Sequence, residues 1–369
     1  MHEISFRSVK KRYGKITALD DVNFDIERGE YVTVLGPTGS GKTTVLKLLA
    51  GLIEPDEGEI RFRDRRVNEL RPEERDVGLV FQNFMLFPHL NVWENVTFGP
   101  QMRGWTREKT DKLGRQMLDL VHLYSRASSY PNELSGGMQQ RVALARTLTP
   151  GSKIMLMDEP LGALDARLRV ELRYELVRLM KGLGITTVHV THDQEEAMTI
   201  SDKIMVLRKG KIEQIGAPME LFLRPRSIFV ANFVGESNFI EGIIREIKDD
   251  FLKVELKDGL TVVVPSVDGA VLGERIVIAV KPESVSIQKG VTKSINHIQG
   301  VIERRSFLGT FVKYSTRLET GDSINSKVLA LQKDKTLEMG DKTTVSFRPD
   351  EAVVYHHPKD GVRRELEVE

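Results

Sequence analysis

A glycine-rich loop, Gly36-Pro-Thr-Gly-Ser-Gly-Lys-Thr43, constrains the fold of this 369-residue chain more than any other feature. The apolar run 31–35 precedes the loop and the helical pattern 44–50 follows it, which is the strand–loop–helix context of a phosphate site. Glycines let successive backbone N–H groups turn inward around phosphates, and the start of the helix adds a positive end. The sequence therefore predicts an α/β fold that binds a nucleoside triphosphate.

Two side chains of the loop have predicted roles of their own. Lys42 places a positive charge against the β- and γ-phosphates, and the Thr43 hydroxyl is a predicted ligand of Mg²⁺. The backbone of the whole segment is expected to surround the phosphates. The predicted nucleotide-binding residues of this segment are Gly36, Pro37, Thr38, Gly39, Ser40, Gly41, Lys42, Thr43 and Thr44.

Other short apolar runs alternate with helical patterns through the first two thirds of the chain. They lie at 77–81, 154–157, 186–190 and 204–207. Runs of this kind between helices are typical of a mainly parallel sheet. The segment 165–182 has a helical pattern followed by Gly184 as a stop signal. Residues 83–150 carry few strand signals and are predicted to form a helical subdomain within a first domain of residues 1–235.

Four polar residues come directly after three of these apolar runs. In α/β proteins the carboxyl ends of parallel strands present the groups that contact ligands. We therefore expect Asp158 to hold Mg²⁺ through water, Glu159 to polarise the attacking water, and His192 to bind the γ-phosphate. Gln82 is predicted to contact Mg²⁺ or the attacking water. Without the glycine loop, each signal would indicate no more than a polar residue at a strand end.

The segment Leu134-Ser-Gly-Gly-Met-Gln-Gln-Arg141 opens another helical pattern, which predicts a second anion site at a helix start. It closely resembles the signature motif of ATP-binding cassette (ABC) ATPases, in which the signature of one cassette closes over ATP held by another. The resemblance implies ATP and Mg²⁺ as ligands and a homodimer. It also implies that the signature acts in trans through Leu134, Ser135, Gly136, Gly137 and Gln139.

The remaining motifs follow in the order of the same family. Gln82 and His192 resemble its Q-loop and H-loop, and Asp165 resembles the aspartate of its D-loop, although Ala163 stands where many members have serine. Tyr13 resembles the aromatic residue that stacks on adenine. By the same resemblance, the segment 83–105 would contact membrane subunits. Its apolar residues, at least half of which fit the core of the helical subdomain equally well, are Phe84, Met85, Leu86, Phe87 and Trp93.

Residues 236–355 are rich in Val and Ile and contain a weak internal repeat. The segment 238–245 resembles 296–303, and the segment 273–283 resembles 340–350, with a longer offset that implies an insertion in the second copy. Two related, barrel-like β units are predicted. The region resembles the paired oligonucleotide-binding-like (TOBE/MOP-like) domain of importer ATPases of the maltose, polyamine and ferric-ion type. We interpret it as a regulatory or dimerisation domain, followed by a frayed, charged tail at 356–369.

Composition limits the partners. Lys and Arg number 54 against 53 Asp and Glu, so no excess charge favours nucleic acid, and the absence of cysteine fits the cytoplasm. No apolar run approaches the ~18 residues that span a bilayer. The resemblance implies the ATPase subunit of a binding-protein-dependent importer, peripheral on the cytoplasmic face of the membrane. Its implied partners are integral membrane permease subunits and, through them, an extracytoplasmic solute-binding protein.

The C-terminal region resembles the spermidine/putrescine branch most, which predicts a polyamine as the cargo. Importers of ferric ion, sugar or sulfate remain alternatives. A soluble ABC ATPase that is not coupled to transport is the third possibility, and solute-dependent hydrolysis would discriminate among them.

Overall fold

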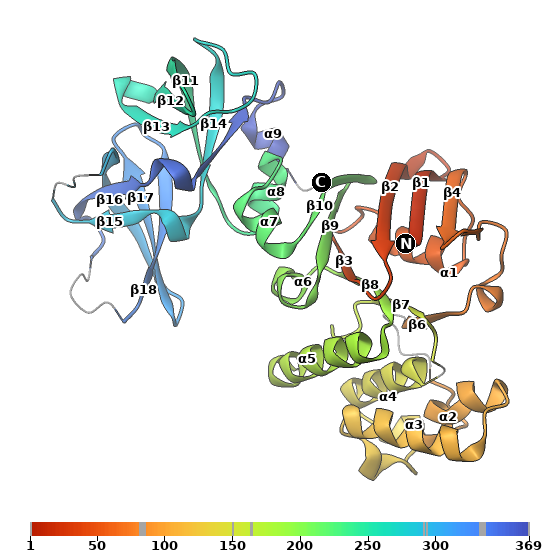
Figure 1. The fold of residues 1–369 in the computed structure, drawn as a ribbon. Helices are drawn as coiled ribbons and strands as arrows, with labels where there is room; N and C mark the ends of the chain where they lie inside the picture. Colours follow the sequence, from red (N-terminus) through yellow and green to blue (C-terminus); the bar gives the residue numbers. More distant parts are fainter. Residues whose placement is uncertain are drawn as a thin grey trace. The chain divides into compact units, whose positions relative to one another are not determined.

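The structure is a computed structural model that describes residues 2–80, 86–149, 151–162, 165–290, 292, 294–331 and 337–367. The chain divides into two compact units, Met1–Met219 and Glu220–Glu369 (Figure 1). The segment 220–235, which the sequence predicts to belong to the first domain, packs within the second unit. The predicted boundary between the two domains, near residue 235, stays a prediction. Of the helices in the described ranges, none combines the length and apolar character needed to cross a membrane.

A six-stranded sheet forms the centre of the first unit, in the order β10-β9-β3-β8-β7-β6. Five of these strands are parallel, and β10 pairs antiparallel with β9 at one edge. This confirms the predicted mainly parallel sheet. The strands are β3 (Tyr31–Leu35), β6 (Val77–Val80), β7 (Ile154–Asp158), β8 (Thr186–Thr191), β9 (Lys203–Arg208) and β10 (Lys211–Gly216).

A second, antiparallel sheet of the first unit has the order β2-β1-β4-β5. Helix α1 (Lys42–Ala50) lies in one apolar core with residues of both sheets, through buried side chains such as Val45 and Leu49. Because this core holds α1 on one side of the parallel sheet, the loop that enters the helix is held at the end of β3. The strands of the second sheet are β1 (His2–Tyr13), β2 (Ile16–Glu27), β4 (Glu57–Phe62) and β5 (Arg65–Arg66).

The predicted helical subdomain contains α2 (Val92–Met102), α3 (Arg107–Leu120) and α4 (Gly136–Leu148). The three helices share one apolar core with β6 and gather beside that strand in Figure 1. The predicted helix at 165–182 is also confirmed as α5 (Ala166–Leu183), which Gly184 ends in a left-handed conformation. Shorter elements of this unit are α6 (Gln194–Ile200) and the 3₁₀ turns Pro72–Glu74, Tyr124–Arg126 and Pro131–Glu133.

The second unit contains two five-stranded antiparallel sheets, in the orders β13-β12-β11-β14-β20 and β15-β19-β16-β17-β18. They enclose one apolar core of Val, Ile and Leu side chains. The first sheet has β11 (Asn238–Lys248), β12 (Phe251–Glu255), β13 (Thr261–Pro265), β14 (Arg275–Val280) and β20 (Ala352–His356). The second has β15 (Ser286–Gln288), β16 (Asn296–Phe307), β17 (Phe311–Leu318), β18 (Ser323–Leu329) and β19 (Lys342–Phe347).

The two copies of the internal repeat interlock. Strand β15 ends the first copy but pairs with β19 of the second, and β20 ends the second copy but pairs with β14 of the first. Two buried asparagines that begin the copies reinforce the exchange. Asn238 makes two hydrogen bonds to the backbone of Asn325, and Asn296 makes two to the backbone of Val263, all at 2.7–2.8 Å. The sequence predicts the two related units but not this exchange of strands.

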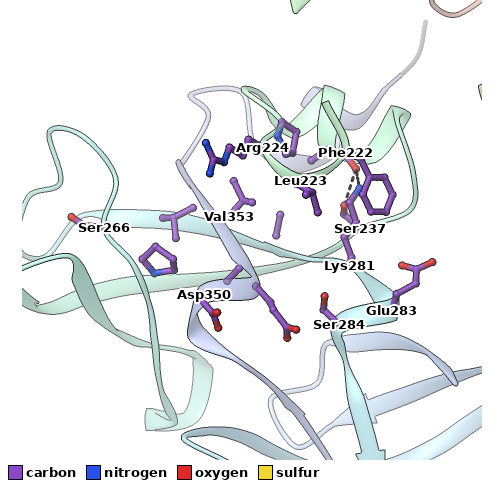
Figure 2. A pocket seen from close by; sticks show the side chains of 17 residues that line it. Phe222, Leu223, Arg224, Ser237, Ser266, Lys281, Glu283, Ser284, Asp350 and Val353 are labelled. Carbon is purple, nitrogen blue, oxygen red and sulfur yellow. Dashed lines mark hydrogen bonds between the residues drawn. The ribbon is translucent and has the colours of Figure 1, made fainter. Parts of the chain in front are cut away.

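Three short helices accompany the β unit: α7 (Pro218–Leu223), α8 (Ile228–Phe233) and α9 (Val362–Leu366). The Lys281 ammonium donates to the carbonyls of Ala231 and Gly235 at 2.8 and 3.2 Å. It also lies 4.8 Å from the ring centroid of Phe222, beside a cavity of about 600 Å³ (Figure 2). Helix α9 packs against α8, so the prediction of a frayed tail is wrong for Val362–Leu366.

Candidate active site

The glycine loop fits against neighbouring segments so closely that two of its glycines are required. A Cβ atom at Gly36 would lie 2.3 Å from the carbonyl oxygen of Leu207. One at Gly41 would lie 2.6 Å from the carbonyl oxygen of Ala18, and Gly41 has a φ of 107° that other residues rarely adopt. These contacts hold the loop between β3 and α1. In the described structure no side chain caps α1, whose first N–H groups can therefore bind an anion.

Lys42 is the first residue of α1 and is 9% exposed. Its ammonium donates hydrogen bonds to the carbonyls of Gly36 and Pro37, both at 2.8 Å. Burial lowers the pKa of Lys42, and the nearby carboxylates of Glu159 and Asp158 oppose that shift. The positive charge is thus held at the loop, within the influence of the two carboxylates that follow β7.

Asp158 and Thr43 supply oxygen atoms suited to a hard cation. The Thr43 hydroxyl donates a hydrogen bond to Asp158, whereas burial and the neighbouring Glu159 charge raise the pKa of Asp158. Among the described residues, no group of three or more His, Asp or Glu side chains is arranged to hold a metal ion by itself, so a cation here would also need ligand oxygens. This donor set fits Mg²⁺, which commonly binds one or two carboxylates together with substrate phosphates. The third predicted ligand, Gln82, lies outside the described residues.

Glu159 begins the turn after β7 with a φ of 47°, a left-handed conformation that is unusual for a residue other than glycine. Its N–H donates to the carbonyl of Val190 at 2.9 Å, and its carboxylate lies 2.8 Å from His192 Nδ1. The ends of β7 and β8 are therefore joined through both backbone and side chain. Backbone strain of this kind is concentrated at functional sites.

The sheet order explains why residues far apart in the sequence meet. Strand β8 lies between β3 and β7, and all three run in parallel. The glycine loop follows β3, the carboxylate pair follows β7, and His192 follows β8. The structure therefore brings Lys42, Thr43, Asp158, Glu159 and His192 to one edge of the sheet, where the sequence predicts them.

The predicted signature residues lie elsewhere, at the start of α4. Ser135 caps this helix, and its hydroxyl accepts a hydrogen bond from the N–H of Met138 at 3.3 Å. Gln139 donates to the carbonyls of Pro131 and Leu134 and so fixes the turn before the helix. Leu134 is buried, whereas Ser135 and Gly136 are exposed and Gly137 is half-buried. Exposed donors at a helix start are open to a ligand from outside the chain.

Other predicted positions differ in what the structure shows of them. Asp165 caps α5 by accepting the N–H of Leu168 at 3.0 Å. Tyr13, at the end of β1, is 45% exposed and thus open to stacking.

In the segment predicted to contact membrane subunits, Leu86, Phe87 and Trp93 are half-buried, and Leu86 and Trp93 pack against the core of the helical subdomain. Phe84 and Met85 lie outside the described residues.

Sequence reasoning missed a buried polar cluster behind His192, formed by Tyr31, His189 and Glu196. All three are less than 5% exposed. The spacing of Asp193 and Glu196 predicts a helix cap, which accounts for Asp193 but not for where the Glu196 carboxylate points. No pattern in the sequence links Tyr31 to the other two residues, because the parallel pairing of β3 and β8 brings them together.

The chain matches two described domain families. Residues 19–162 match the ABC transporter family, and residues 278–354 match the TOBE domain. Spermidine/putrescine import ATP-binding protein PotA of Trichormus variabilis is 40% identical over 326 residues, which are 88% of this chain and 86% of the relative. The chain belongs to the ABC transporter ATP-binding family.

Other similar proteins agree with this assignment. Fe(3+) ions import ATP-binding protein FbpC of Fusobacterium nucleatum is 37% identical over 99% of this chain and 95% of the relative. The dimeric bacterial ABC transporter cassette MJ0796 is 37% identical and has a TM-score of 0.54, with 58% of this chain and 98% of the cassette covered. This ABC protein is therefore an ATPase with the predicted α/β cassette and a C-terminal β domain.

Proposed function

We propose that this chain is the ATP-hydrolysing subunit of an importer for a polyamine such as spermidine or putrescine. The arrangement of Lys42, Asp158, Glu159 and His192 at one sheet edge carries the hydrolytic part of the proposal. The relatives named for spermidine/putrescine import support the cargo.

Hydrolysis is assigned to the residues after β7 and β8. The Glu159 carboxylate polarises the attacking water and accepts its proton. The 2.8 Å contact between His192 Nδ1 and this carboxylate keeps the carboxylate in position and orients the His192 ring toward the γ-phosphate. Lys42 exchanges its two carbonyl partners for β- and γ-phosphate oxygens. Thr43 and Asp158, with Gln82, would hold Mg²⁺, which neutralises phosphate charge when bound.

A second copy of the chain completes the site in this proposal. The exposed start of α4, with Ser135 and Gly136, is open to a nucleotide held by the glycine loop of the other copy. MJ0796, whose dimer was solved in a post-hydrolysis state with ADP and Pi, supports this arrangement. In the importer, the dimer would act at the cytoplasmic face of the membrane with permease subunits and, through them, a solute-binding protein.

Glu159→Gln tests the hydrolytic assignment. Phosphate release by the full-length protein should fall by about 10³-fold, because an amide accepts no proton from the attacking water. ATP-driven dimerisation, measured by light scattering, should persist. Glu171→Gln, on an exposed carboxylate of α5, is the matched control and should hydrolyse ATP normally. A Glu159→Gln protein with a rate near that of the wild type would show that another group is the base.

Ferric ion is the second candidate cargo, because FbpC of F. nucleatum aligns with almost the whole chain, the C-terminal domain included. The two candidates are distinguished by whether a polyamine or ferric ion stimulates ATP hydrolysis by the assembled transporter.

A further inference from the structure

Three side chains form a buried polar chain directly behind the turn that carries His192. Tyr31 from β3 and His189 from β8 meet through the tyrosine hydroxyl and His189 Nδ1, 2.8 Å apart. His189 Nε2 lies 3.7 Å from Glu196 Oε1 of α6. Their exposed fractions are 1%, 0% and 4%. Buried polar side chains are normally fully hydrogen-bonded, so this chain requires an explanation.

The contacts of Tyr31, His189 and Glu196 define one tautomer of His189. Burial lowers the pKa of His189 and raises the pKa of Tyr31 well above its usual value, so both are neutral. The tyrosine hydroxyl then donates to Nδ1, and the ring proton of His189 sits on Nε2. That N–H points to the Glu196 carboxylate, yet 3.7 Å is too long for a hydrogen bond. Neither His189 Nε2 nor Glu196 Oε1 has a hydrogen-bond partner within the described residues.

The other oxygen of Glu196 connects the chain to the His192 turn. Glu196 Oε2 accepts a hydrogen bond from the Thr191 hydroxyl at 2.7 Å, and that hydroxyl accepts the N–H of Asp193 at 3.0 Å. The residues on both sides of His192 are therefore anchored to one carboxylate. In a capping box, a glutamate at this position of α6 would bond back to the N–H of Asp193. Glu196 instead turns inward to Thr191.

We propose that Tyr31, His189 and Glu196 are positioning residues for His192, and that their chain closes when ATP engages His192. Closure brings His189 Nε2–H into hydrogen-bonding distance of Glu196 Oε1, so that both lone polar atoms gain a partner. The closed chain then holds Thr191 and Asp193, and with them His192, in the position for hydrolysis. The proposal rests on the proposed role of His192 at the γ-phosphate.

Tyr31→Phe tests the network because it removes one hydroxyl and keeps the ring. In the full-length protein, kcat for ATP hydrolysis should fall about tenfold while KM for ATP changes less than about twofold, since no nucleotide contact is lost. His189→Leu should lower kcat further, by about 30-fold, and His189→Gln should restore most of it because its amide can donate to Glu196. Tyr355→Phe is the control: it removes a half-buried hydroxyl that donates to the Pro225 carbonyl, both within the second unit, and should leave kcat unchanged.

A spectroscopic measurement reports the closure itself. In ¹⁵N-histidine-labelled Glu159→Gln protein, His189 should appear as the Nε2-protonated tautomer, and its Hε2 resonance should move downfield when MgATP is added. An unchanged resonance on saturation with MgATP would overturn the closure. Equal kcat in wild type, Tyr31→Phe and His189→Leu would overturn the positioning role. So would equal losses in His189→Leu and His189→Gln, which would indicate packing alone.

His192→Ala separates this proposal from the proposed function on which it rests. If His192→Ala hydrolyses ATP normally, the role assigned to His192 is wrong, and the proposed positioning of His192 by Tyr31, His189 and Glu196 fails with it. If His192→Ala is inactive while Tyr31→Phe and His189→Leu match the wild type, the proposed function stands and the network proposal alone fails.

Discussion

Two lysines, one in each unit, make almost the same local contacts, Lys42 buried and Lys281 half-buried. The Lys42 ammonium donates to the carbonyls of Gly36 and Pro37, and the Lys281 ammonium donates to those of Ala231 and Gly235. Burial lowers the pKa of both. A lysine that satisfies two backbone carbonyls is therefore no sign of function in itself.

The surroundings distinguish the two sites. Lys42 follows a glycine loop at an uncapped helix start and lies near the carboxylates of Asp158 and Glu159. Lys281 lies against the Phe222 ring and joins α8 to the β unit (Figure 2). The first lysine can exchange carbonyls for phosphate oxygens, because donors that bind the same anion surround it. Lys281 follows no glycine loop and holds the C-terminal end of α8 through two backbone carbonyls there, so we expect it to stabilise the fold.

Lys42→Met is the change with the largest expected effect on this comparison. ATP affinity, measured by titration calorimetry, should fall about 100-fold, which corresponds to roughly 3 kcal/mol. Lys281→Met removes the same kind of charge and should leave ATP affinity unchanged. Equal ATP affinity in Lys42→Met and wild type would contradict the phosphate site.

Lys281→Met should affect stability instead. Because the Gly235 carbonyl would lose its lysine donor and the Ala231 carbonyl would keep only the Ser237 hydroxyl, the free energy of unfolding of the second unit should fall by about 1–3 kcal/mol. Urea unfolding of the full-length protein, followed by circular dichroism, measures this loss. An unchanged unfolding transition together with impaired ATP hydrolysis would reverse the roles of the two lysines.

A smaller effect is expected on the pH dependence of stability. Burial lowers the pKa of Lys281 from 10.5 to about 8 in the folded protein. Between these values the unfolded chain keeps a proton that the folded chain has lost, so wild type should gain stability relative to Lys281→Met as the pH rises from about 8 to about 10.5. Below pH 8 the difference should be constant. A difference in unfolding free energy that is flat from pH 7 to 10 would contradict the lowered pKa.

The sequence predicts which residues gather at the carboxyl edge of the parallel sheet because each part of the pattern is local. A glycine loop between a strand and a helix, and polar residues directly after apolar runs, need only the rule that parallel strands present their carboxyl ends together. Lys42, Asp158, Glu159 and His192 were all identifiable on that basis. Gln82 was identifiable in the same way, and the roles of all five residues stay predictions.

The features that sequence reasoning missed depend on contacts between distant segments. Strands β15 and β20 are similar in the two repeats, and nothing in either copy indicates that each pairs with the sheet of the other. The sequence indicates only that Tyr31 is an aromatic residue of the core. The parallel pairing of β3 with β8 brings its hydroxyl within hydrogen-bonding distance of His189. Short-range patterns do not encode such pairings, because tertiary packing decides them.

The most direct test of the central claim is ATP hydrolysis by this subunit assembled in membrane vesicles with its permease and solute-binding partners. Putrescine, spermidine, ferric ion, maltose and sulfate would be added in turn, with Glu159→Gln assembled in parallel. The proposal predicts that spermidine or putrescine stimulates phosphate release by the wild type and that Glu159→Gln stays inactive. If the subunit assembles with no permease and no solute changes its rate of ATP hydrolysis, the assignment as an importer ATPase is contradicted.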